Sequence, residues 1–339
     1  MRAFPCAVCG NLLFFENTVC LRCGSPVGYV PELRTMLPLD RLAEAHVRCD
    51  NRERAGCNWL VPGSRGLCSA CALTRTRPSD GDLEAQEAFR VAEAAKRRLV
   101  FQLDEFGLAH PSTGPGRLAF DLLSSRDAPV TTGHADGLIT LDLAEGDDAH
   151  REALRRQMDE PYRTMLGHFR HETGHYYWQQ LIDGSPALQD FRREFGDERA
   201  DYAQALQRHY AEEPPLGWEQ TFVSGYAAAH PWEDWAESFA HYLHIRDTLQ
   251  TAASFGVIVA GPDLPPRADE VLASMPTADG DDFDVLIATW LPLTMALNVV
   301  NRSMGKDDLY PFVLAPAVLD KLRFVHRLVL ASERAKLPT

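Results

Sequence analysis

The spacing of apolar residues divides the chain into a loop-rich beginning, a short β-rich stretch and a long helical remainder. Between residues 82 and 106, Leu99, Leu103 and Phe106 recur at helical spacing and predict a helix. Residues 116–145 contain three short β-prone runs, and the turn-forming pair Asp136-Gly137 predicts a hairpin between the last two. From residue 146 onward the pattern is helical almost throughout. A small sheet followed by many helices predicts an α+β fold.

Prolines and glycines indicate where the helices of this second half begin and end. Pro161 begins one helix and Gly184 ends it, Ser185-Pro186 opens the next helix, and Pro231 opens a third. The most apolar window, residues 285–300, contains a proline and is shorter than the run a membrane span requires. We therefore expect it to form a buried helix.

The composition is that of a water-soluble chain of two or three domains. The 339 residues are 45% hydrophobic and 24% charged, and the first ten lack the apolar run of a signal peptide, so the sequence predicts a cytoplasmic protein with no membrane contact. The net charge of −14 is uneven, because residues 1–75 hold nine arginines against six acids. The rest of the chain is strongly acidic and would repel phosphates, which argues against nucleic acid as a partner.

All eight cysteines lie within the first 71 residues, in two groups of four. The first group forms two CxxC knuckles ten residues apart, an arrangement that suits a tetrahedral zinc ion; the second group has one irregular half. Four disulfides are the alternative, but they require an oxidising compartment, for which the chain shows no export signal. We expect two closed, structural zinc sites, with the ligands Cys6, Cys9, Cys20 and Cys23, and Cys49, Cys57, Cys68 and Cys71.

A second chemical motif lies in the predicted helix after Pro161, in the stretch GHFRHETGHYYW. His171 and His175 stand one helical turn apart, so both imidazoles can bind one zinc ion, with Glu172 beside it as a general base for water. Gly174 costs roughly 0.5–1 kcal/mol relative to alanine inside a helix. Its presence suggests that another element packs closely against the helix at this point.

A catalytic zinc also needs a third protein ligand. A histidine six residues after His175 would indicate a metzincin, but Leu181 occupies that position. The predicted helix from Pro231 carries Glu233, Glu237 and His241 on one face, at i, i+4 and i+8. We expect Glu237 to be the ligand, because the small and aromatic residues after it suit a buried helix contact, with Glu233 as the alternative.

These motifs resemble the gluzincin metallopeptidases, in which an acid in an AEFFA-like helix supplies the third ligand. More closely, the chain resembles a bacterial family of zinc-binding metallopeptidases that carry an N-terminal double zinc ribbon. The matching stretches are CAVCGNLLFFENTVCLRCG, CNWLV, GHFRHETGHYYW, FGDERADYAQALQRHY, HPWEDWAESFAHYLH and LYPFVLAPAVLDKLRFVH. The resemblance implies a catalytic zinc held by His171, His175 and Glu237, with Glu172 as the base.

One position departs from the thermolysin-like pattern. Those enzymes have an aspartate four residues after the glutamate ligand, where it orients a ligand histidine, whereas this chain has His241 four residues after Glu237. The orienting group is therefore open among Asp197, Asp201 and Asp234. An oxyanion partner is also required, and His230, Tyr226 and His241 are the candidates.

The predicted organisation is a double zinc-ribbon module at residues 1–75, a linker and helix at 76–115, and a zincin-like metallopeptidase domain at 116–339. Two functions remain open. The first is a zinc peptidase, with three zinc ions, that acts on peptides or proteins and has ribbons that bind a protein partner. The second is a non-catalytic ribbon protein that binds protein or nucleic acid on a zincin scaffold. The intact His171, Glu172, His175 and Glu237 favour the first.

Overall fold

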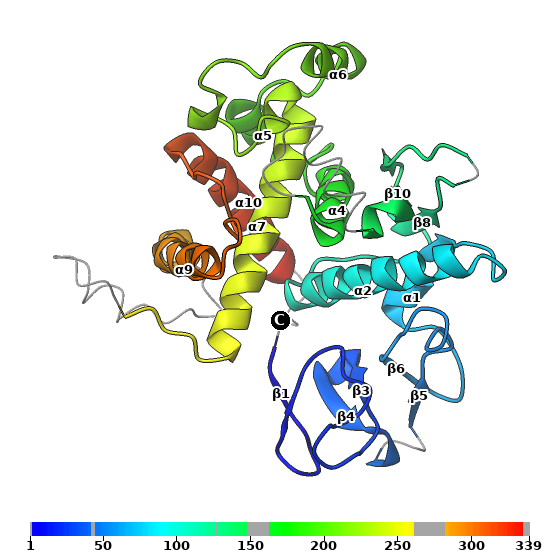
Figure 1. The fold of residues 1–339 in the computed structure, drawn as a ribbon. Helices are drawn as coiled ribbons and strands as arrows, with labels where there is room; N and C mark the ends of the chain where they lie inside the picture. Colours follow the sequence, from blue (N-terminus) through cyan, green and yellow to red (C-terminus); the bar gives the residue numbers. More distant parts are fainter. Residues whose placement is uncertain (1, 42–44, 127, 148–162, 261–281, 335–339) are drawn as a thin grey trace. The chain divides into compact units, whose positions relative to one another are not determined.

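The computed structural model describes residues 2–41, 45–126, 128–147, 163–260 and 282–334 (Figure 1). The chain forms two compact units, and each is described by itself. Unit 1 comprises residues 1–105, 109–154 and 164–166, and unit 2 comprises residues 106–108, 155–163 and 167–339. The predicted α+β class is confirmed, with a cysteine-rich zinc-ribbon region followed by a mostly helical part.

Unit 1 begins with three antiparallel strand pairs that carry the cysteines. These strands are β1 (Phe4–Pro5) with β2 (Leu12–Leu13), β3 (Val27–Val30) with β4 (Thr35–Pro38), and β5 (His46–Arg48) with β6 (Leu60–Pro62). Two short 3-10 turns, η1 (Pro31–Leu33) and η2 (Leu39–Arg41), and the helix α1 (Ser69–Ala72) complete this part. Because each strand pair is small, the cysteine clusters and the packing against the following helix must supply most of its stability.

The rest of unit 1 is a four-stranded sheet with the long helix α2 (Leu83–Glu105), which confirms the helix expected at residues 82–106. The sheet order is β7 (Thr74–Thr76), β8 (Ala119–Leu123), β10 (Leu138–Asp142) and β9 (Gly133–Ala135). Strand β8 runs parallel to both β7 and β10, and β9 and β10 form the expected hairpin through Asp136-Gly137. The 3-10 turn η3 (Leu143–Gly146) follows. The apolar pattern did not reveal β7, because only its pairing with the distant β8 makes it a strand.

Helix α2 and the ribbons share one aromatic core within unit 1. The ring of Phe101, on α2, lies 4.8 Å from Phe15 and 5.5 Å from Tyr29, and Trp59 lies 5.0 Å from Tyr29, all measured between centroids. All four side chains are buried to 2% exposure or less. Tilted and edge-on aromatic contacts of this kind add to the stabilisation from burial, so the ribbons depend on α2 for a large part of their core.

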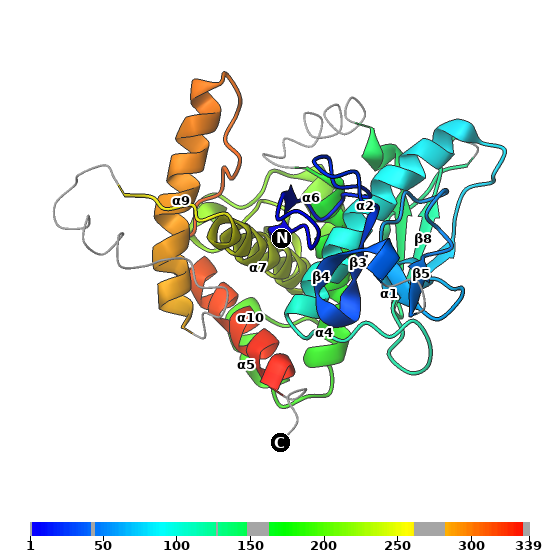
Figure 2. The ribbon, with the colours of Figure 1, turned by 90° about the horizontal axis from the view of Figure 1, so that it is seen from below.

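Unit 2 is formed by six helices and two 3-10 turns in its described part (Figure 2). The helices are α4 (Met165–Leu181), α5 (Leu188–Phe195), α6 (Tyr202–Ala211), α7 (Pro231–Ser254), α9 (Phe283–Ser303) and α10 (Pro316–Arg334), and the turns are η4 (Trp218–Gln220) and η5 (Ala227–Ala229). The helix starts predicted near Pro186 and at Pro231 are confirmed by α5 and α7, whereas Pro161 lies outside the described residues.

One expectation about these helices is wrong. The window 285–300 was expected to be buried, but α9 buries only one face, through Phe283, Trp290 and Leu293. On the opposite face Met295 and Val299 are 66% and 60% exposed. A run of apolar residues does not distinguish a helix buried all round from one that keeps an apolar face at the surface.

Helices α4 and α7 of unit 2 approach each other closely at Gly174. A Cβ atom built on Gly174 would lie 2.9 Å from the Cα and 3.2 Å from the carbonyl oxygen of Ala236, which is too close for any side chain. The indole of Trp235 donates a hydrogen bond of 2.8 Å to the carbonyl oxygen of Gly174. The sequence-based expectation that another element packs closely at Gly174 is confirmed.

This contact generates a test of the packing. Gly174→Ala improves intrinsic helix propensity by up to about 1 kcal/mol, yet we expect it to lower the free energy of unfolding of unit 2 by roughly 1–3 kcal/mol, because the backbone of α7 must move. Urea unfolding followed by tryptophan fluorescence measures the change. Gly133→Ala is the control, since no atom lies within 4 Å of its added Cβ. A Gly174→Ala protein as stable as the wild type would contradict the close packing.

Candidate metal centres

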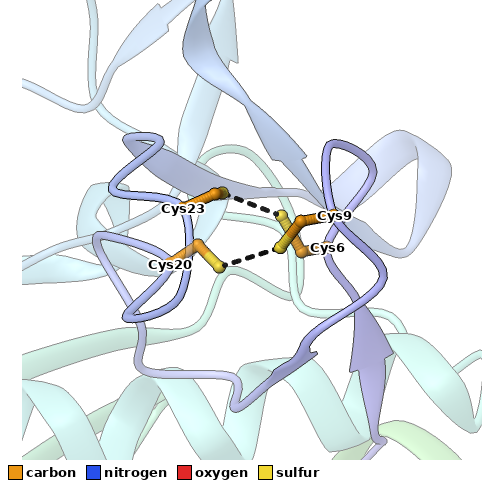
Figure 3. Close-up of side chains that lie close together, drawn as sticks. All are labelled: Cys6, Cys9, Cys20 and Cys23. Atoms are coloured by element: carbon orange, nitrogen blue, oxygen red, sulfur yellow. Dashed lines mark hydrogen bonds between the residues drawn. The ribbon is translucent and has the colours of Figure 1, made fainter.

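The first four cysteines converge on one point in unit 1, as their spacing predicts (Figure 3). The Sγ atoms of Cys6 and Cys23 lie 3.8 Å apart, and those of Cys9 and Cys20 lie 3.7 Å apart. Each knuckle ends in a glycine with positive φ, Gly10 at 71° and Gly24 at 74°. Four thiols at these separations fit the tetrahedral sulfur set that zinc prefers.

The second group of cysteines is also brought together, and all four of its side chains are buried. The backbone amide of Cys68 donates to Cys49 Sγ at 3.3 Å, and Cys71 Sγ lies 3.8 Å from the carboxylate of Glu93 on α2. That buried carboxylate pairs with the ammonium of Lys96, which is itself fully buried, at 2.5 Å. Helix α2 thus supplies charged groups directly behind the second zinc-binding set.

A third cluster lies in unit 2, where α4 meets α7. His171, His175 and Glu233 place one ligand atom each within 4.8 Å of one another, and in the described part of the chain they are the only such group outside the cysteines. Glu233 Oε2 is 3.0 Å from His171 Nε2 and 3.4 Å from His175 Nε2. All three side chains are at least 88% buried.

The predicted ligand Glu237 takes a different place. Its Oε1 lies 2.7 Å from Nδ1 of His171, on the opposite edge of the imidazole from Glu233, and its Oε2 accepts a hydrogen bond of 2.6 Å from the hydroxyl of Ser224. A carboxylate on Nδ1 fixes the tautomer that presents Nε2 as a ligand. Glu237 therefore holds the ring of His171, which leaves Glu233 facing both imidazoles.

The electrostatics of this cluster favour positive charge on or beside His171. Burial would lower the pKa of His171, but its hydrogen bonds to Glu233 and Glu237 raise it well above the ordinary value. Burial would raise the pKa of Glu237, yet its hydrogen bond with His171 lowers it to about 2. Two buried carboxylates thus require positive charge between them. The donor set of two imidazole nitrogens and one carboxylate oxygen fits zinc with an open position.

Glu172 and the aromatic candidates surround the cluster. Glu172 is the residue after His171 on α4, and burial of its side chain raises its pKa. The ring of Tyr226 lies 5.8 Å from the ring of His171, and the hydroxyl of Tyr202 donates to Glu233 Oε1 at 2.6 Å. Tyr202 is a contact that the sequence did not indicate, because it begins a separate helix, α6.

The two histidines considered as oxyanion partners are already engaged. Nδ1 of His230 accepts from the backbone amide of Trp232, so His230 caps α7, and its Nε2 lies 3.1 Å from the carbonyl oxygen of Ala200. Nδ1 of His241 lies 2.7 Å from the hydroxyl of Tyr310.

The aspartates considered as orienting groups also have other partners. Asp197 pairs with Arg199 at 2.7 Å, and the carboxylate of Asp201 accepts from the backbone amide of Gln204 and caps α6. Asp234 pairs with Lys321 at 2.6 Å. These contacts leave Glu237 as the described carboxylate hydrogen-bonded to Nδ1 of a histidine in the cluster.

Lys321, on α10, is a buried cation that the sequence pattern did not indicate. Besides Asp234, its ammonium donates to the carbonyl oxygen of Thr221 at 2.7 Å and lies 4.2 Å from the ring centroid of Phe222. Asp234 follows Glu233 on α7, and the segment from Thr221 leads to Ser224 and Tyr226. Lys321 therefore ties together the two segments that carry residues of the cluster. The sequence around a lysine in a helix does not indicate whether its side chain is buried.

Comparison with known proteins identifies two families in the chain. The family described as "putative zinc-binding metallo-peptidase" matches residues 85–328, and a zinc-ribbon domain family matches residues 3–82. Uncharacterised proteins of Mycobacterium bovis and of two strains of Mycobacterium tuberculosis are each 52% identical over 337 residues, covering 97% of this chain and 95% of their own length. No solved structure matches the chain.

The first cysteine cluster can be tested by removing one ligand. Cys20→Ser should release the zinc of the first ribbon and lower the unfolding free energy of unit 1, because a structural zinc contributes folding energy directly. The zinc of unit 2 should stay bound. Zinc content by mass spectrometry and urea unfolding measure both effects, with Arg22→Ser, at an exposed non-ligand position of the same knuckle, as the control. Loss of the unit 2 metal in Cys20→Ser would contradict the independence of the sites.

The buried ion pair can be tested on α10. Lys321→Met leaves Asp234 buried without its cation and should cost about 3–5 kcal/mol of unfolding free energy at pH 8. Burial already raises the pKa of Asp234 to about 7, although Lys321 opposes this shift. A raised pKa means that the folded state binds the proton more tightly, so the loss should shrink as the pH falls to 6.

The control lies two residues away on the same helix. Arg323 forms an exposed pair with Asp284 at 2.7 Å, and Arg323→Met should cost at most about 1 kcal/mol. The double variant Lys321→Met/Asp234→Asn should recover part of the loss. Equal losses for Lys321→Met and Arg323→Met would show that the buried pair has no special role.

Proposed function

Because the chain belongs to the family described as putative zinc-binding metallo-peptidases, we propose that unit 2 hydrolyses peptide bonds at the cluster between α4 and α7. The observation that carries this proposal is that the two ring nitrogens of His171 contact two different carboxylates. One edge of its ring faces Glu233 and His175, and the other is held by Glu237. A ligand histidine with a carboxylate behind it is the usual arrangement of zinc enzymes.

We assign His171, His175 and Glu233 as the ligands of a catalytic zinc, and Glu237 as the residue that orients His171. This assignment moves the third ligand one helical turn from the residue expected from the sequence. It also accounts for the apparent departure from the thermolysin-like pattern, since an acid now stands four residues after the ligand. Ser224 fixes Glu237 in turn, through its hydroxyl.

His171, His175 and Glu233 would hold the zinc ion, which would supply a Lewis acid that polarises a carbonyl and acidifies water. Glu172 then acts as the general base, accepting the proton of the attacking water and passing it to the nitrogen of the departing amine. Burial of Glu172, at 9% exposure, raises its pKa and so makes its carboxylate a stronger base.

Tyr226 is the residue we propose for stabilising the oxyanion. Its ring lies 5.8 Å from the ring of His171, and burial raises the pKa of its phenol far above the ordinary value, which keeps the hydroxyl a proton donor. His230, a candidate from the sequence, caps α7 through its ring and is better suited to holding the start of the ligand helix. Tyr202 donates to Glu233 and steadies the ligand carboxylate.

Four variants separate the ligands from the base. Glu233→Ala and His175→Ala should lose the zinc of unit 2, because each removes one of three ligands. Glu237→Ala should keep it with roughly 10–100-fold weaker affinity, as is usual for groups behind a ligand. Glu172→Gln should retain the metal yet lose peptide hydrolysis. Zinc content, competition with a chromophoric chelator, and turnover of an internally quenched peptide library measure these effects.

The exposed Glu219→Ala variant is the control, and it should match the wild type in metal content and turnover. If Glu237→Ala loses the metal and Glu233→Ala keeps it, the ligand is Glu237 as the sequence first indicated. If the wild type holds two zinc ions rather than three and cleaves nothing in the library, the non-catalytic ribbon protein becomes the better description.

A further inference from the structure

Helix α9 carries an apolar face that remains exposed in the described part of the chain. Met295 and Val299 are 66% and 60% exposed, and Val285 and Leu291 are 43% and 44% exposed. The other face is packed into unit 2 through Trp290 and neighbouring apolar residues. Figure 2 shows α9 at the margin of the helices that form unit 2. A contiguous apolar surface of this kind marks an interaction site more often than chance exposure does.

The spacing on this face identifies the kind of occupant. Within the exposed side of α9, one row of positions recurs at intervals of three and four residues, as the a and d positions do in a helix that pairs lengthwise with another helix, with Leu291 and Val300 beside the row and Pro292 half-buried within it. A flat protein surface or a strand would not require that period. These seam positions are Val285, Ala288, Pro292, Met295, Val299 and Arg302.

We propose that the occupant is α9 of a second copy of this chain, antiparallel to the first. With a two-fold axis between residues 293 and 294, every a position faces a d position of the other copy, as an isologous contact requires. The facing pairs are residue 285 with 302, 288 with 299, and 292 with 295. The two inner pairs are thus apolar on both sides, and the outer pair places Val285 against Arg302.

The charges agree with this pairing. No charged residue lies between Asp284 and Arg302, so two chains of net charge −14 can meet here without facing acids. In the antiparallel arrangement Asp284 of one copy comes to lie next to Arg302 of the other, at both ends of the seam. Both side chains are largely exposed and now form only surface pairs, with Arg323 and Asp308.

A bilayer surface fits less well. By length and composition α9 could cross a membrane, but 39% of its most apolar window is buried inside unit 2. The described residues at its ends include Asp282, Asp284, Asp307 and Asp308 against Arg302 and Lys306. Surface helices that bind membranes are flanked by basic residues, whereas these ends carry a net negative charge.

Sedimentation velocity of the full zinc-loaded chain tests the dimer. A single helix pair buries less than a standard interface, so we expect a dissociation constant on the order of 1–100 μM and a concentration-dependent dimer. Met295→Lys should make the chain monomeric over this range. Val300→Lys is the matched control, because Val300 is 57% exposed on the same helix but lies off the seam, and it should leave the dimer intact.

Disulfide cross-linking tests the direction and register. Ala288→Cys mixed with Val299→Cys should form a cross-linked heterodimer far faster than either variant alone. Cross-links within the single variants at equal rates would overturn the antiparallel register. A wild type that stays monomeric up to about 200 μM would overturn the dimer itself. Flotation of the wild type, but not of Met295→Lys, with phosphatidylcholine vesicles would assign the face to a bilayer instead.

Discussion

The close approach of α4 and α7 at Gly174 and Ala236 is the constraint on which the site in unit 2 depends. Two helices normally stand 8–10 Å apart, with side chains filling the space between them. Here a glycine removes that spacer, and the indole of Trp235 hydrogen-bonds to the backbone of the opposing helix. Because Gly174 lies between His171 and His175 in the chain, the contact brings the imidazoles against the carboxylates of α7 without long or mobile side chains.

The same contact fixes how far α7 is displaced along its axis relative to α4. Glu233 and Glu237 stand one turn apart on the same face, on either side of Ala236, and the displacement determines which of them faces both imidazoles. The helical period of the sequence shows that Glu233 and Glu237 lie on the same face of α7, but it does not show how far α7 is displaced along its axis relative to α4. The sequence therefore narrowed the proposed third ligand to two residues, and the geometry of packed helices was needed to place Glu233 beside both imidazoles and Glu237 at Nδ1 of His171.

Other features of the molecule are likewise determined either by residues that are neighbours in the sequence or by contacts between distant segments. The two groups of four cysteines and the starts of α5 and α7 follow from residues that are near one another in the sequence, and the sequence predicted them. Strand β7, the burial of Lys321 and the exposed face of α9 depend on segments far along the chain. Lys321 makes its contacts 87 and 100 residues away, with Asp234 and Thr221. No local pattern distinguishes such a lysine from one in solvent.

The aromatic core shared by Phe15, Tyr29, Trp59 and Phe101 has a consequence for any attempt to separate the two regions that the families match. The ribbons bury their rings against α2, a helix that falls within the stretch matched by the peptidase family. Separating the ribbons from α2 would remove the rings of Phe15 and Tyr29 from Phe101 and expose an apolar surface on α2. A chain divided between the two matched regions would therefore expose apolar surface on α2, and the mycobacterial relatives, which match 97% of the chain, align with both regions.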